Sequence, residues 1–461
     1  MSLCCALVVG TPPVIADVEY RRSGGVADLF DPLVVAGYRA LFTCSAHFFA
    51  GRPLDDIRKI ELADTAHLDY PDPVIDAVRR TVSAADKEGN VQIAAYRDSM
   101  GCTVLPQHWD ETDAHHLPYV ELGPAPDMSN VGFPAGDRVS LDANGYRRGY
   151  AYLADVVQNA FDGDSYGEGY VTISVLIIKD GKLLAEQYRS GFGVHSGYRT
   201  WSTAKSISAA VMGVAHGQGI YDVNGTADVP EWQFGADPRR QITYKQLFWM
   251  SSGLAGGGNN TYAVYFGGQD VVSAITSTEL LTDPGTTWRY ANNDTLLLLR
   301  ALRHRINDDT RYMRYPYDEL LHRIGMYHTR MESDHLGNFV GSSQVYTTAR
   351  DLARFGVLLA DDGVWQGQRI LPEGWVEFLR APAPTRPAEK DEWGYGAQFW
   401  LLGEMPGVPA NAYTSAGNKG QFVSVVPDDK LVIVRTGVNP IGSTWDQEKL
   451  VAAVVRVIDE H

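Results

Sequence analysis

Two apolar hairpins lie far apart in this chain and enclose a long stretch of helical pattern. The first, VTISVLIIKDGKLLAEQYR, starts at Val171 and turns at Asp180-Gly181, and the second, QFVSVVPDDKLVIVRTG, starts at Gln421. Asp-Gly between two apolar runs is a strong hairpin signal. Hairpins this distant complete one sheet only if the residues between them form an insertion. We therefore predict an α+β fold, an antiparallel sheet flanked by helices with a mostly helical insertion at roughly residues 220–400.

Helical periodicity marks the other elements of the chain. The predicted helices lie at residues 32–50, 146–161, 202–217, 244–250, 292–306, 347–363 and 445–460. Residues 1–140 carry Pro-rich and acidic turns and no chemical motif, so we expect them to form an N-terminal accessory region. Residues 141–461 then form the second domain, which holds the predicted sheet.

Charge excludes some classes of partner. The formal net charge is −16, whereas nucleic-acid binding needs a basic face and adhesion to anionic lipid needs basic clusters. The first sixteen residues are uncharged and moderately apolar, but they lack a basic start and are too short to span a bilayer. We predict no membrane span, favour a bacterial periplasmic or exported location over a cytoplasmic one, and leave a homodimer open.

The cysteines and one acidic, histidine-containing stretch do not predict a metal site. Cys44 and Cys102 are expected to be buried free thiols, with a disulfide as the alternative if the chain is exported. No Cys-x-x-Cys pattern is present. The stretch DETDAHHLPY contains Asp110, Asp113, His115 and His116 without regular ligand spacing, so we predict a solvated loop. No metal and no cofactor is predicted.

Two serines compete as a nucleophile. Ser165 lies in GDSYG, which matches the G-x-S-x-G pattern. That pattern works at a strand-to-helix turn, where the hydroxyl is lifted above a sheet. Here a predicted helix precedes the motif and a strand follows it, so we interpret Ser165 as a turn residue.

Ser202 and Lys205 lie one helical turn apart in the segment STAK. Residues at i and i+3 share a helix face, so the amine can reach the hydroxyl. A lysine acts as a base only if burial or nearby positive charge lowers its pKa, and the apolar helix offers burial. The alternative is a serine that caps the helix start.

Three motifs in order resemble the serine hydrolases of the penicillin-recognising fold. They are STAK at Ser202, YAN at Tyr290 and SAG at Ser415, and MSSGL at Met250 also resembles this family. The group contains class C β-lactamases, D-alanyl-D-alanine peptidases, esterases and 6-aminohexanoate-dimer hydrolase. The resemblance covers about residue 141 to the C-terminus.

The resemblance implies roles for five residues. Ser202 would attack the acyl carbon and Lys205 would share its proton. Tyr290 would act as a phenolate base in acylation, unless it is a buried tyrosine bonded to the main chain. Asn292 would hold Lys205 or the substrate, and the N–H groups of Ser202 and Asn418 would bind the oxyanion.

Substrate contacts are predicted at the third motif and in a Gly-rich stretch. Ser415 and Gly417 would line the site, but β-lactamases usually have lysine or histidine where this chain has Ser415. Lys419 would lie on the same strand face as Ser415 without taking its place. Tyr262 and Tyr265 follow the glycines at 256–258 and would form a mobile lid, or else a solvent loop.

These observations lead to one main functional hypothesis and two alternatives. The chain is predicted to be a serine hydrolase that cleaves a small ester or amide through an acyl-enzyme on Ser202. The first alternative is a β-lactamase or D-amino-acid peptidase on the same fold. The second is a sensor that is acylated once and does not turn over.

Overall fold

The two distant hairpins join in one seven-stranded antiparallel sheet. A computed structural model of the chain describes residues 31–255, 259–386, 392–402 and 405–461. The strands of this sheet are β5 (Thr172–Lys179), β6 (Lys182–Tyr188), β12 (Gly394–Tyr395), β13 (Trp400–Leu401), β14 (Tyr413–Gly417), β15 (Gln421–Val426) and β16 (Leu431–Gly437). Their order is β12-β13-β14-β15-β16-β5-β6, and β16 pairs with β5 from Leu431 opposite Lys179 to Gly437 opposite Thr172. The α+β prediction is confirmed.

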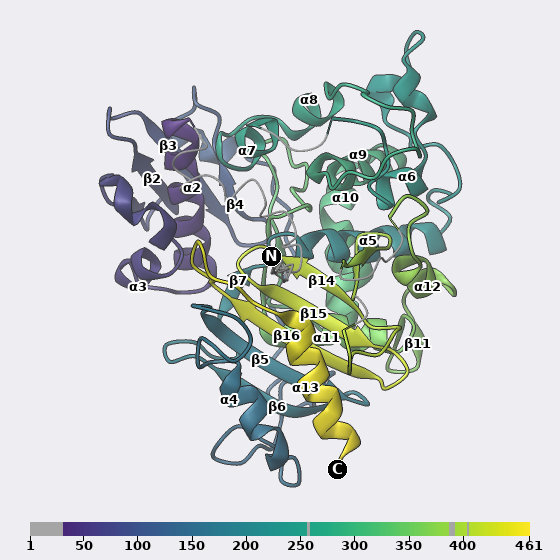
Figure 1. The fold of residues 1–461 in the computed structure, drawn as a ribbon. Helices are drawn as coiled ribbons and strands as arrows, with labels where there is room; N and C mark the ends of the chain where they lie inside the picture. The colour runs from purple at the N-terminus through teal and green to yellow at the C-terminus, as the bar shows by residue number, and fades with distance from the viewer. Residues whose placement is uncertain (1–30, 256–258, 387–391, 403–404) are drawn as a thin grey trace, which may run out of the picture.

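Both faces of this sheet are covered, which explains why its strands are nearly continuous apolar runs. Alternate side chains point to opposite faces. Leu176 and Val432 belong to the large core with helices α5 (Thr203–Gly217) and α11 (Ala349–Ala360). Ile177 and Ile433 belong to a second core with α4 (Ala154–Asn159) and α13 (Gln447–Asp459). Figure 1 shows α13 lying across the sheet.

Helices make up most of the regular structure between β6 and β12. Besides α5 and α11 they form the helices α6 (Tyr244–Phe248), α7 (Asn259–Phe266), α8 (Val271–Thr276), α9 (Asn292–Ile306), α10 (Asp309–Pro316) and α12 (Trp375–Arg380). They also form η5 (Pro230–Trp232), η6 (Pro238–Gln241), η7 (Tyr317–Leu321) and η8 (His322–Ile324). Two small sheets lie here as well: β7 (Gly197–Arg199), β9 (Val345–Thr348) and β8 (Arg330–Met331) in that order, and β10 (Val364–Trp365) with β11 (Gln368–Arg369).

The described part of the accessory region packs one helix on a separate four-stranded sheet. Its helical elements are α2 (Pro32–Cys44), η1 (Ser45–Phe49), α3 (Leu54–Lys59), η2 (Ala63–Leu68) and η3 (Glu111–His116), and its strands are β1 (Val74–Asp76), β2 (Thr81–Ala85), β3 (Val91–Arg97) and β4 (Gly101–Val104). Helix α2 packs on β2 and β3 and also on α7 (Figure 1). The large core therefore contains residues of both regions, and the domain boundary near residue 140 stays a prediction.

Two local predictions are wrong. The helix expected at 146–161 is reduced to a 3-10 turn, η4 (Ala151–Leu153), and the short α4. Gly149, in the first turn of the expected helix, has a φ of 98°, which a right-handed helix cannot include. The segment with Asp110, Asp113, His115 and His116 has no buried residue, as expected for a solvated stretch, but it forms the 3-10 helix η3 and not a loop, with Asp110 capping its start.

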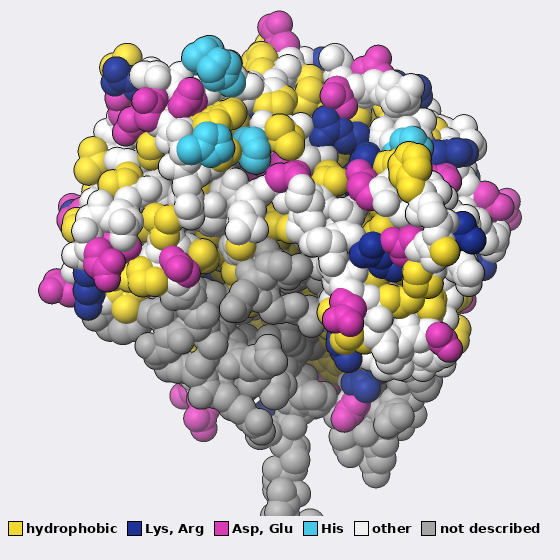
Figure 2. All heavy atoms as spheres, turned by 90° about the horizontal axis from the view of Figure 1, so that it is seen from above, with side chains coloured by type: hydrophobic (Ala, Val, Ile, Leu, Met, Phe, Trp, Pro, Cys, Tyr) yellow, Lys and Arg dark blue, Asp and Glu magenta, His cyan; other side chains and the backbone are white. Residues whose placement is uncertain are grey.

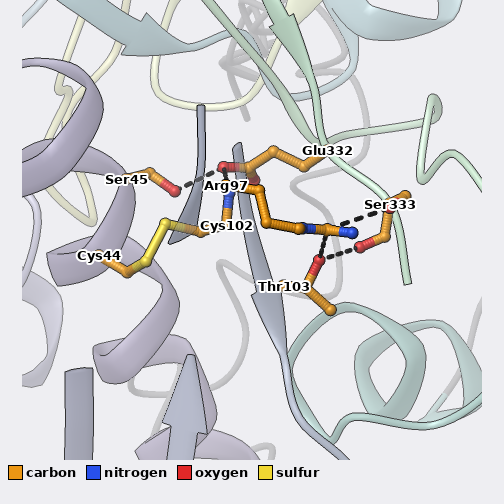
Figure 3. The surroundings of a disulfide bond; sticks show 7 residues. All are labelled: Cys44, Ser45, Arg97, Cys102, Thr103, Glu332 and Ser333. Atoms are coloured by element: carbon orange, nitrogen blue, oxygen red, sulfur yellow. Dashed lines mark hydrogen bonds between the residues drawn. A yellow bond between two sulfur atoms is a disulfide. The ribbon is translucent and has the colours of Figure 1, made fainter. Parts of the chain in front are cut away.

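Cys44 and Cys102 form a disulfide, so the expectation of free thiols is wrong. The bond joins the end of α2 to β4 (Figure 3). Beside it, Oε1 of Glu332 accepts hydrogen bonds from the Ser45 hydroxyl at 2.6 Å and from the Cys102 N–H at 3.0 Å. The disulfide therefore ties α2 to the sheet of the accessory region, and the two hydrogen bonds to Glu332 attach this junction to the segment that follows β8.

Three further observations concern a membrane, a metal ion and the charge of the surface. No helix in the described ranges is long and apolar enough to cross a membrane. Within those same ranges, no three His, Cys, Asp or Glu side chains are grouped so as to hold a metal ion. Figure 2 shows acidic and basic side chains interspersed over the face seen from above, where histidines also gather.

Candidate active site

Ser202 lies at the N-terminus of α5, and its hydroxyl does not cap the helix. Instead, Ser202 Oγ lies 3.1 Å from Lys205 Nζ. The preceding residue, Trp201, has a φ of 49°, a left-handed conformation that is uncommon for a bulky residue. The helix-cap alternative for Ser202 therefore does not describe its side chain.

Lys205 is buried with only 1% of its surface exposed. Its Nζ lies 2.6 Å from Oδ1 of Asn292 and 2.8 Å from the main-chain oxygen of Ser342. Burial lowers the pKa of Lys205 from 10.5 to about 7, because removal from water disfavours the charged form. The amine is therefore substantially uncharged at neutral pH.

Tyr290 lies next to both Lys205 and Ser202. Lys205 Nζ is 4.9 Å from the centroid of the Tyr290 ring, and this ring stacks on Trp400 at 5.5 Å. Burial raises the pKa of Tyr290 well above 10, against a smaller lowering by a hydrogen bond with the Ser202 side chain. The phenol is thus protonated at rest, which does not favour the phenolate expected from the sequence. Asn292, two residues later, begins α9.

Main-chain N–H groups of two segments remain available beside the serine. Among the described residues, the N–H groups of Ser202 and Asn418 donate no hydrogen bond. Gly417, the last residue of β14, packs against the main chain just before Ser202. If Gly417 had a Cβ, that atom would lie 2.1 Å from the Thr200 oxygen and 3.2 Å from the Ser202 nitrogen. Only glycine allows this approach.

Ser415 lies on a late strand as expected, whereas Lys419 is placed differently from the sequence-based expectation. Ser415 is fully buried in β14, and its hydroxyl has no hydrogen-bond partner in the part of the chain that the structure describes. Lys419 is not on the strand but in the turn after it, with a φ of 60°. Its ammonium group forms an ion pair with Asp64 of η2. Lys419 therefore faces the accessory region.

The two tyrosines of the expected lid lie on a helix. Tyr262 and Tyr265 belong to α7, and the ring of Tyr262 stacks on Phe266 at 6.4 Å. The Tyr265 hydroxyl lies 2.5 Å from Oγ of Ser342, so Tyr265 is part of the support of the Lys205 site. The solvent-loop alternative is wrong for these two residues, which lie on a helix, and the lid role stays a prediction. The glycines at 256–258 lie outside the described residues.

Ser165 lies in an exposed turn between α4 and β5. Its hydroxyl donates to Oδ2 of Asp162, and Oδ1 of the same carboxylate accepts hydrogen bonds from the N–H groups of Asp164 and Ser165. The interpretation of Ser165 as a turn residue agrees with this geometry.

One contact could not have been found from the sequence. The Ser342 main-chain oxygen accepts a hydrogen bond from Lys205 across 137 positions of the chain. A main-chain acceptor has no residue signature, and no periodicity singles out Ser342.

The sheet between two helical layers, with α5 and the inserted helices beside it, defines a β-lactamase/transpeptidase-like fold, whose known members include hydrolases. The chain belongs to the Beta-lactamase family, whose model matches residues 157–437. It is 24% identical over 396 residues to 6-aminohexanoate-dimer hydrolase of Paenarthrobacter ureafaciens, covering 76% of this chain and 93% of that protein. The family resemblance predicted from the three motifs is confirmed.

Solved structures agree with this fold. A family VIII carboxylesterase matches with a TM-score of 0.56 at 15% identity, over 68% of this chain and 98% of the esterase. A penicillin-binding protein homologue from Caulobacter crescentus matches with a TM-score of 0.54, also at 15% identity and over 68% and 98% of the two chains. Likenesses at these identities show the fold alone.

Proposed function

We propose that this chain is a serine hydrolase that cleaves a small ester or amide through an acyl-enzyme on Ser202. The observation that carries the proposal is the set of three oxygens around Lys205 Nζ, at 2.6, 2.8 and 3.1 Å. Two of these oxygens, of Asn292 and Ser342, are acceptors only. A neutral amine has two hydrogens and one lone pair, so these acceptors take both hydrogens and leave the lone pair for the Ser202 hydroxyl.

In this proposal Lys205 is the base that activates the serine. A serine hydroxyl is a weak nucleophile until a base accepts its proton, and a base works best when its pKa lies near the working pH. The pKa of Lys205, lowered by burial to about 7, meets that condition. Ser202 Oγ then bonds to the acyl carbon while its proton moves to Lys205.

Tyr290 completes the proton path as a donor. Its protonated phenol, beside Ser202 and Lys205, gives its proton to the leaving oxygen or nitrogen as the acyl bond breaks, and takes the proton that Lys205 received. Water then attacks the acyl-enzyme, its proton passes to the same groups, and Ser202 is restored with release of the acid.

The negative oxygen of the tetrahedral intermediate binds to the N–H groups of Ser202 and Asn418. Loss of one such donor typically costs about 10²- to 10³-fold in rate. Their lack of an acceptor among the described residues supports this role. Asn292, Ser415, Gly417 and Tyr262 are proposed to hold or shape the substrate pocket around them.

The substrate class follows from the third motif. Ser415 offers no cation for the carboxylate of a β-lactam, and Lys419 is already paired with Asp64. We therefore favour a small ester, or an amide of the kind named in the 6-aminohexanoate-dimer hydrolase relative, over β-lactams and D-amino-acid peptides.

A substrate panel tests this proposal. The purified protein is assayed with p-nitrophenyl butyrate, the linear dimer of 6-aminohexanoate and nitrocefin, and the acylated peptide is identified by mass spectrometry. We expect an acyl group on Ser202 and faster hydrolysis of the ester than of nitrocefin. Faster turnover of nitrocefin would establish the β-lactamase alternative, and a burst with no steady state would establish the acylated sensor.

A further inference from the structure

The residues next to the two proposed oxyanion donors share an unusual backbone. Trp201 precedes Ser202 and Lys419 follows Asn418, and their φ values are 49° and 60°. A left-handed conformation costs free energy in any residue with a side chain, and it persists only where the surroundings impose it. The question is which groups impose it here.

An aromatic and cationic stack holds Trp201. The guanidinium of Arg199 lies 4.7 Å from the Trp201 ring centroid and 4.8 Å from that of Phe42. The Phe42 and Trp201 rings are themselves 5.5 Å apart, and Arg199 donates a hydrogen bond to the Ser343 hydroxyl at 3.0 Å. Phe42 belongs to α2, so the accessory region forms one wall of this stack.

An ion pair holds Lys419. Its partner Asp64 lies on η2 of the accessory region, and the side chains of Lys419 and Asp64 are only 9% and 5% exposed. An ion pair sheltered from water is screened much less than a surface pair. Hydrogen bonds from the Asn439 N–H to the Lys419 oxygen and from Arg435 to the Gly420 oxygen hold the same turn from the sheet side. The ion pair with Asp64 adds a tether to the accessory region.

We infer that Phe42 and Asp64 of the accessory region are positioning residues for the oxyanion site. Phe42, through Arg199 and Trp201, sets the N–H of Ser202, and Asp64, through Lys419, sets the N–H of Asn418. The accessory region, which carries no chemical motif, thereby becomes a part of the catalytic apparatus. The inference rests on the proposed acyl-enzyme mechanism.

The same sheet supplies a matched control at the other end of β15. Lys430, in the turn between β15 and β16, also has a left-handed backbone, with a φ of 45°. Its Nζ is tethered to Asp361 at 2.7 Å. The side chains of this pair are 55% and 43% exposed, so the control matches the left-handed turn and its ion pair but not the burial. Nothing in the proposed mechanism involves this turn.

The experiment compares Asp64→Asn with Asp361→Asn in ester hydrolysis. We expect Asp64→Asn to lower kcat by about 10- to 100-fold, since small misplacement of a reacting group has effects of this size, with KM changed less than twofold. Asp361→Asn is expected to keep the parent kcat. Equal effects of the two variants would overturn the inference.

A rescue variant separates positioning from folding. Glycine adopts a left-handed backbone without a tether, so Asp64→Asn combined with Lys419→Gly is expected to recover most of the lost kcat. Failure of this rescue would contradict the role assigned to the tether. If Asp64→Asn does not fold, Phe42→Leu serves as the second test, with the same expected fall in kcat at constant KM and with an unchanged kcat as the overturning result.

Ser202→Ala, assayed alongside, keeps the two proposals distinguishable. Full activity in Ser202→Ala would refute the proposed mechanism itself. An inactive Ser202→Ala with an Asp64→Asn variant that matches Asp361→Asn would refute the positioning role alone.

Discussion

The turn around Ser165 and the start of α5 at Ser202 present the same functional group to different partners. The Ser165 hydroxyl donates to Asp162. Although burial raises the pKa of Asp162, hydrogen bonds from Ser165, from Tyr170 and from the turn itself outweigh it and hold that pKa far below its usual range. The Ser202 hydroxyl instead meets an amine whose pKa is about 7.

The difference teaches that the proton affinity of the neighbour separates a candidate nucleophile from a structural serine. A carboxylate that stays ionised at every ordinary pH cannot accept the proton of Ser165. A buried amine that is half neutral near pH 7 can accept the proton of Ser202. The G-x-S-x-G and S-x-x-K patterns do not encode this difference, because it depends on burial.

The largest expected difference in activity is between two variants, in each of which one of the two serines is replaced by alanine. Ser202→Ala removes the proposed nucleophile and is expected to lower kcat/KM for p-nitrophenyl butyrate by at least about 10⁴-fold. Ser165→Ala is expected to keep the parent value within twofold. Circular dichroism of both variants checks folding, and an inactive Ser165→Ala would reverse the assignment.

Removal of the base comes second. Lys205→Met deletes the amine but keeps much of the buried chain, and is expected to lower kcat by about 10²- to 10⁴-fold, the usual range for a general base. Retention of more than about a tenth of the activity would show that another group accepts the serine proton.

Lys205→Met is also expected to stabilise the fold. The pKa of Lys205 is lowered in the folded state, so between about pH 7 and 10.5 the unfolded chain binds a proton that the folded chain does not. The stability of the parent therefore rises with pH across this window. The gain in Tm from Lys205→Met should be largest at pH 7 and below and should shrink toward pH 10.5.

The pH profile of the parent is the third prediction. Lys205 acts in its neutral form, so kcat/KM is expected to fall tenfold per pH unit below about pH 7 and to level off above it. A stopped assay with a neutral ester measures this profile. The inflection should be absent from the remaining activity of Lys205→Met, and its persistence there would assign it to another group.

The smallest expected effect is that of Ser165→Ala on the stability of the fold. Ser165→Ala loses one exposed hydrogen bond to Asp162 and is expected to lower the free energy of unfolding by less than about 1 kcal/mol. Urea unfolding measures this change. A loss of several kcal/mol would mean that the turn matters to the fold far more than its exposure indicates.

Local patterns predicted most of the fold. The hairpin from Gln421 forms β15 and β16 at the expected residues, and helix α9 occupies the expected 292–306, because alternation and helical periodicity are properties of short segments. The helix expected at 146–161 does not form through its first turns, where Gly149 has a positive φ.

The candidate site was only partly within reach of the sequence. Ser202 and Lys205 are neighbours on one helix, so their contact follows from spacing. The tether from Asp64 to Lys419 and the acceptor at Ser342 join residues that only the fold brings together. The sequence also left undecided whether Cys44 and Cys102 form a disulfide, because neither their spacing nor the composition sets the redox state of the thiols.

The pairing of β16 with β5 also affects how the chain is made. The hydroxyls of Ser174 and Thr436, which contact each other across these strands, are 262 positions apart. At ribosomal rates of roughly 5–20 residues per second, β5 waits on the order of 10 to 50 s for its partner. Throughout that interval the nascent chain carries an apolar strand with one unpaired edge, which attracts other strands. Slower initiation lowers the concentration of such unfinished chains, and is therefore expected to raise the soluble yield of this protein more than stronger expression does.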